Sequence, residues 1–234
     1  MAGKKKLTNR GNANATARRT AAGPQLPRPT SLPSPAELGA HCIGLAALDA
    51  VRGLRFQKYS AVTKGDLTTF VLDRGNGDEL QVVFAGDECL VRGFDHECER
   101  SPFMVGHVWP GTYTGLPEVF RPAVAVPEGA AYDGDLFGDS PGKEGRLRPT
   151  TFAKWWNGEG WVEGQLALGA PDGGFDYLFG CLDASIDFDG FDRTIALRVF
   201  EGHPITDDEL RTLKPDVDLP TVRAAWKNMG YGVV

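Results

Sequence analysis

The sequence predicts an α+β protein, in which one helix precedes an antiparallel β-meander and a helical segment follows it. Three observations support this prediction. A helix-capping signal at residues 34–37 opens a run with apolar residues at helical spacing. Short segments rich in β-branched and aromatic residues, separated by glycine-containing turns, occupy residues 55–94. Helical capping and amphipathic patterns return between residues 172 and 230.

The first helix is predicted to begin after Ser34. In "SPAE", Ser34 is the N-cap, Pro35 takes the first helical position and Glu37 completes a capping box. Gly53 ends the helix. The apolar positions at helical spacing include Leu38, Cys42 and Leu45. This stripe predicts a face that packs against a core.

Four strands are predicted next, in the segments "RFQKYSAV" (55–62), "LTTFVLD" (67–73), "ELQVVFA" (79–85) and "CLVRGF" (89–94). The Asn76–Gly77 pair is a strong hairpin signal, and "AGDE" makes the following turn. Residues 99–150 hold many prolines and glycines and are predicted to be mostly loop, with a helical turn near 117–120. The aromatic residues of its first half are expected to pack: Phe103, Trp109, Tyr113 and Phe120.

A second hairpin is predicted around residues 157–160, flanked by Trp155, Trp156 and Trp161. Helical patterns then follow, including a second capping box from Thr206 to Glu209 and an apolar stripe in residues 219–229. We interpret residues 34–234 as a single α+β domain that contains a mobile loop at 129–146. Residues 1–33 are interpreted as a disordered basic tail, since they have almost no large apolar side chains.

Charge is divided unevenly along the chain. The net charge is −6, but residues 1–35 contain seven of the 25 basic residues and none of the 31 acidic ones. The remainder therefore carries 18 basic and 31 acidic residues, a balance of −13. Such a body attracts basic protein surfaces and repels phosphates. Contact with nucleic acid is therefore expected, if at all, through residues 4–19 of the tail.

Several classes of protein are disfavoured. There is no run of 18 apolar residues to cross a membrane and no apolar segment after "MAGKKK" to form a secretory signal. The four cysteines are widely spaced, as is typical of reduced thiols in a cytoplasmic protein. Motifs for phosphate binding, dinucleotide binding, zinc proteases and serine hydrolases are absent. No cofactor is predicted.

The densest chemistry lies in "GFDHEC", directly after the fourth predicted strand. Asp95, His96 and Glu97 are candidate acid/base residues of a metal-assisted hydrolase, while His96, Cys98 and His107 are candidate metal ligands. The spacing matches no established metal motif. The favoured alternative is structural: Asp95 hydrogen-bonds the turn, and His96 anchors the following loop through its ring nitrogens.

An acidic section between residues 172 and 192 is the candidate surface for a basic partner. It lacks the spacing and the terminal glutamate of an EF-hand. The carboxylates would steer the partner and Trp156 would anchor it. The candidate partner-binding residues are Asp172, Asp176, Asp183, Asp187, Asp189, Asp192 and Trp156.

Four short motifs carry a resemblance. "GFDHE" (93–97), "SP" (101–102), "WPG" (109–111) and "GLPEVF" (115–120) resemble a set shared by uncharacterised actinobacterial-type cytosolic proteins. The resemblance covers residues 55–230 and is specific in 93–120. It transfers no functional residue, and its one implication is an immunity-type partner role.

Three functions therefore compete at this point. The leading hypothesis is a non-enzymatic, cytoplasmic protein-binding module, of immunity type, that masks a basic partner through an acidic surface. The second is the metal-assisted hydrolase. The third is a structural or particle-associated protein whose basic arm contacts nucleic acid. The absence of a complete catalytic set favours the first.

Overall fold

The computed structural model describes residues 32–53, 57–125, 148–166, 170, 173–176, 178 and 191–232. Residues 1–31 of the predicted tail and the predicted loop at 129–146 lie outside these residues. The helices and strands before the long connection are α2 (Pro35–Arg52), β1 (Tyr59–Lys64), β2 (Leu67–Asp73), β3 (Glu79–Ala85) and β4 (Glu88–Phe94). Those after it begin with α3 (Pro102–Val105), η1 (Glu118–Phe120), α4 (Arg121–Val124), β5 (Phe152–Trp156) and β6 (Trp161–Glu163). The chain continues with α6 (Arg193–Phe200), α7 (Asp207–Leu213) and α8 (Leu219–Asn228).

The six strands form one sheet in sequence order, and every neighbouring pair is antiparallel. The predicted α+β class and meander are therefore confirmed, and the second hairpin extends the meander through the pairing of β4 with β5. Thr151 N, just before β5, donates to Gly93 O at 2.8 Å, which fixes the start of this pairing.

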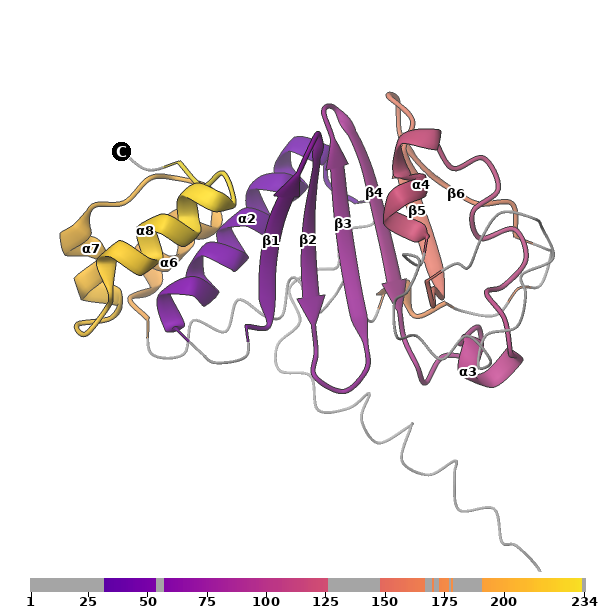
Figure 1. Cartoon of the computed structure of the whole chain (residues 1–234), viewed down its shortest axis with the longest axis horizontal. Coiled ribbons are helices and arrows are strands. Elements are labelled where there is room, and N and C mark those ends of the chain that lie inside the picture. The colour runs from indigo at the N-terminus through magenta and orange to yellow at the C-terminus, as the bar shows by residue number, and fades with distance from the viewer. Residues whose placement is uncertain are drawn as a thin grey trace, which may run out of the picture.

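One face of the sheet packs on helices. Alternating strand residues meet the apolar stripe of α2, and residues of α6 and α8 join the same core; members include Leu38, Leu45, Phe70, Val82, Val91, Phe152, Val199 and Trp226. Figure 1 shows α6, α7 and α8 grouped beside α2, at the end of the molecule remote from α3 and α4. The buried Trp226 side chain donates from Nε1 to Ala47 O at 3.0 Å, which ties α8 to α2.

The opposite face is covered by the first half of the long connection. A second core of buried side chains joins β3, β4 and β5 to η1 and α4, and it consists of Val83, Leu90, Leu116, Phe120, Val124, Ala153 and Trp155. The proline-rich segment therefore folds into short helices and turns that seal the sheet. Phe103 packs its ring against Phe94, with centroids 5.3 Å apart, but 53% of its surface stays exposed.

Candidate functional site

The "GFDHE" segment leaves the sheet at the end of β4, beside the β2–β3 hairpin. In the register of β3 and β4, Glu79 is paired with Phe94. The next residues outward on the two strands are Asp78 and Asp95. The hairpin turn is closed by its own side chains, since Asn76 Nδ2 donates to Asp78 Oδ2 at 2.9 Å and Asp78 N donates to Asn76 Oδ1 at 3.2 Å. Asp78 is thus held rigidly in a buried position.

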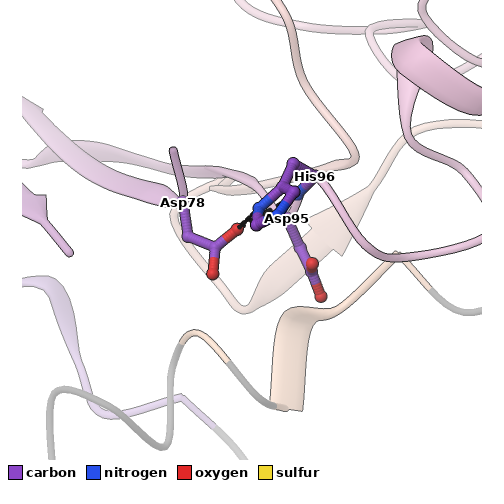
Figure 2. A group of neighbouring side chains, drawn as sticks. All are labelled: Asp78, Asp95 and His96. Atoms are coloured by element: carbon purple, nitrogen blue, oxygen red, sulfur yellow. Dashed lines mark hydrogen bonds and ion pairs between the residues drawn. The ribbon is translucent and has the colours of Figure 1, made fainter. Parts of the chain in front are cut away.

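His96 binds this hairpin through both its backbone and its ring. The backbone N donates to Asp78 Oδ1 at 3.1 Å, and ring Nδ1 lies 2.6 Å from the same oxygen (Figure 2). An ionised carboxylate only accepts hydrogen bonds, so Nδ1 carries the proton and a neutral ring presents its lone pair at Nε2. The ring is 32% exposed, and Nε2 lies 3.9 Å from Glu97 Oε1. The His96 ring therefore anchors the preceding β2–β3 hairpin. The sequence prediction that it anchors the loop that follows is wrong.

Asp95 forms the turn that the sequence predicted. Its Oδ1 accepts from Glu97 N at 2.9 Å, and its own N donates to Thr151 Oγ1 at 3.2 Å. The Thr151 hydroxyl donates in turn to Gly173 O at 2.7 Å, which joins the turn to a distant segment. The predicted hydrogen bond of Asp95 to its turn is confirmed.

Gly174 allows the Asp95 carboxylate its buried position. A Cβ at residue 174 would lie 2.4 Å from Asp95 Oδ2, and the φ of +77° favours glycine as well. Burial raises the pKa of Asp95; the Glu97 N–H opposes this rise, and the negative charge of Asp78 adds to it. The site therefore holds two carboxylates whose negative charges repel each other.

Cys98 and Arg100 follow on the same turn, but their side chains lie in environments different from those of Asp95 and His96. Burial raises the pKa of the Cys98 thiol to about 11, and the charge of Asp95 contributes to the rise. Such a thiol is a poor nucleophile at neutral pH. The Arg100 guanidinium is buried, with Nη1 3.7 Å from Glu163 Oε1. Neither residue supplies an activated group.

In the described part of the chain, one group of three potential ligand residues brings its ligand atoms within 4.8 Å of one another: Asp78, Asp95 and His96. Two of these three, Asp95 and His96, were sequence candidates. Asp78 was not. Cys98 and His107 are outside the group, and Glu97 extends from it with 57% of its side chain exposed.

The candidate partner-binding residues are dispersed where they are described. Asp176 and Asp192 are exposed, and Asp192 caps α6 by accepting from Thr194 N and Ile195 N. Trp156 is half-buried against Trp161, with ring centroids 5.8 Å apart. Asp172, Asp183, Asp187 and Asp189 lie outside the described residues.

Compared with protein-family models, curated proteins and solved structures, the chain matches none of them. Within the described residues, no helix has both the length and the apolar character needed to cross a membrane.

Proposed function

We propose that this chain is a protein-binding module that docks a basic partner through one surface beside the end of β4. This surface, here called the α3 face, consists of Glu97, Glu99, Phe103 and Met104. The observation that carries the proposal is the exposure of two adjacent large apolar side chains, 53% for Phe103 and 71% for Met104. The other large apolar side chains with high exposure in the described residues, Val62 and Val119, stand singly.

The α3 face has the composition of a binding site. Phe and Met are enriched in interfaces, where a few buried anchors supply most of the affinity. The Phe103 ring packs against the Phe94 ring with centroids 5.3 Å apart, so β4 holds it in place. This support lowers the ordering entropy that a partner's binding would cost.

Charge around the anchors selects the partner. Glu97 and Glu99 are exposed, whereas Arg100, the one Lys or Arg of residues 94–105, is buried. Beyond residue 35 the chain has 18 basic and 31 acidic residues. A positively charged partner would be attracted to this surface over a Debye length of roughly 8 Å at physiological salt. Asp176 and Asp192 add to that attraction without belonging to the α3 face.

An immunity-type role is the form of binding that we propose. In that role the chain covers the basic surface of its partner, and the acidic body raises the encounter rate while the α3 face slows dissociation. The effects of the charges and of the apolar anchors can then be separated. Added salt lowers the encounter rate that the charges raise, whereas truncation of Met104 speeds dissociation.

The test is affinity co-purification of the tagged full chain with the products of the neighbouring coding sequences, across a salt series. Wild type is compared with Met104→Ser and with the control Val62→Ser, whose side chain is 62% exposed on β1. We expect a basic partner to co-purify with the wild-type chain, in amounts that fall as the salt concentration rises. Met104→Ser should bind this partner roughly tenfold more weakly than wild type does, as is typical when an anchor residue is truncated. The absence of a partner at every ionic strength, or equal capture by wild type and Met104→Ser, would contradict the proposal.

A further inference from the structure

The group formed by Asp78, Asp95 and His96 combines side chains from two rigid segments. Asp78 belongs to the closed β2–β3 turn, and Asp95 and His96 belong to the turn after β4. Figure 2 shows the Asp78 carboxylate joined to the His96 ring, with the Asp95 side chain next to them. Because backbone hydrogen bonds fix all three positions, the donor atoms are brought together before any ligand arrives.

Asp95 has unused coordination capacity. The residue is 8% exposed, and its Oδ1 accepts from Glu97 N. Its Oδ2 packs above Gly174 and accepts no hydrogen bond from the described residues. Lone pairs of a carboxylate oxygen that no protein donor fills are available to a cation.

Charge in the group is also unbalanced. Asp78 and Asp95 are both buried, and no lysine or arginine forms an ion pair with either of them among the described residues. The nearby Arg92 and Arg100 guanidinium groups instead pair with Glu79 at 3.1 Å and with Glu163 at 3.7 Å. The imidazole of His96 carries at most one positive charge against two carboxylates. A divalent cation would balance the group.

We propose that Asp78, Asp95 and His96 bind one divalent transition-metal ion. Two carboxylate oxygens and one imidazole nitrogen suit Mn²⁺ or Zn²⁺, while an all-oxygen set would be required to favour Mg²⁺ or Ca²⁺. The ligand atoms lie within 4.8 Å, so shifts on the order of 1 Å bring them to metal-bond distances of about 2.0–2.2 Å. The ion replaces the hydrogen bond between His96 and Asp78, and any proton held by a ligand atom is released to solvent.

The partial exposure of the His96 ring leaves the ion open to solvent on one side. Coordination positions not filled by the three side chains would hold water. Glu97, whose Oε1 lies 3.9 Å from His96 Nε2, is the nearest described carboxylate that could accept a hydrogen bond from such a water. The site shares Glu97 with the α3 face but includes neither Phe103 nor Met104, the apolar side chains on which partner binding depends.

The test is a titration of the full chain with Mn²⁺, in which the electron paramagnetic resonance signal of the free ion measures how much Mn²⁺ remains unbound. Mn²⁺ is chosen because thiolates bind it weakly compared with Zn²⁺, which keeps the four cysteines from competing. We expect one site per chain that is weakened at least tenfold by Asp95→Asn and by His96→Gln. Asp95→Asn retains an acceptor for Glu97 N, so the turn is preserved.

Two controls separate this site from others. His107→Gln removes a histidine that lies outside the group, and Asp87→Asn removes an exposed carboxylate at the β3–β4 turn. Both are expected to bind Mn²⁺ as wild type does. No binding by wild type at 1 mM Mn²⁺, or equal binding by wild type, Asp95→Asn and His96→Gln, would overturn the proposal. Circular dichroism of each variant shows whether a loss of binding is a loss of fold.

Discussion

Asp49 shows how a single buried carboxylate connects helix to sheet. It lies near the C-terminus of α2, where only 1% of it is exposed, and its Oδ2 accepts from Lys58 N at 2.6 Å and Tyr59 N at 3.0 Å. Asp49→Ala would leave two backbone N–H groups without this acceptor, so we expect a loss of about 2–4 kcal/mol in the free energy of unfolding. Asp49→Asn retains an amide oxygen and should lose less than half as much. Urea denaturation of both variants measures the difference, and equal losses would contradict this role.

Asp78 is the residue that sequence reasoning missed at the candidate site, although a usable signal was present. The tight turn after β3 pairs Ala85 with Glu88, and the same register pairs Glu79 with Phe94. One further step places residue 78 opposite residue 95, so the two aspartates could have been predicted to meet. The direction of the His96 ring could not, because it depends on a side-chain hydrogen bond across the two turns.

At the scale of elements, two capping boxes make α2 and α7 sensitive to acid. Ser34 and Glu37 form the first box, and Thr206 and Glu209 form the second. The hydrogen bond with the Ser34 side chain and that with its backbone N–H lower the pKa of Glu37 below its ordinary value of 4.5. A carboxylate with a lower pKa in the folded state stabilises the fold above its unfolded pKa, and this stabilisation disappears as pH falls through the folded pKa.

We therefore expect Glu37→Gln to flatten the decline in stability between about pH 5 and pH 3, where this carboxylate takes up its proton. Glutamine still suits the third position of a capping box, so the helix should form at neutral pH. Thermal unfolding at a series of pH values measures the effect, with the exposed Glu88→Gln as the control. An acid decline of unchanged steepness in Glu37→Gln would show that the box does not contribute.

Most elements were predictable because each has a strong local signal. The predicted segments 67–73 and 79–85 coincide with β2 and β3, and both capping boxes are present. The four-residue helices α3 and α4 were not predicted, since one turn of helix is too short to show a 3.6-residue period. Phe103 was expected to pack, and its ring does lie against Phe94, but 53% of the residue stays exposed, because a sequence pattern does not show which face of so short a helix meets the core.

For the whole molecule, α2 is the element through which the sheet and the C-terminal helices share one core. It contacts β1, β2 and β3 on one side and α6 and α8 on the other. The helical periodicity predicted the apolar stripe of α2 but not the distance between α2 and α6. That distance depends on the packing of two segments more than 100 residues apart in the sequence. Gly44 sets that distance. A Cβ there would lie 2.5 Å from Phe200 O and 2.7 Å from Val199 O.

Gly44→Ala is therefore expected to displace α6 from α2, although alanine favours the helix by about 1 kcal/mol relative to glycine. The obstructing atoms belong to the backbone and cannot rotate away, so we expect a net loss of about 1–3 kcal/mol in the free energy of unfolding. Gly39→Ala is the matched control in the same helix, because its Cβ would meet only the Phe84 ring at 3.5 Å, an ordinary contact distance. That variant should be unchanged or slightly more stable. Urea denaturation, monitored by tryptophan fluorescence, measures the stability of both variants. The fluorescence includes that of Trp226, whose Nε1 hydrogen-bonds α8 to α2. If Gly44→Ala proved as stable as Gly39→Ala, the close approach of α6 would not hold the C-terminal helices to the sheet.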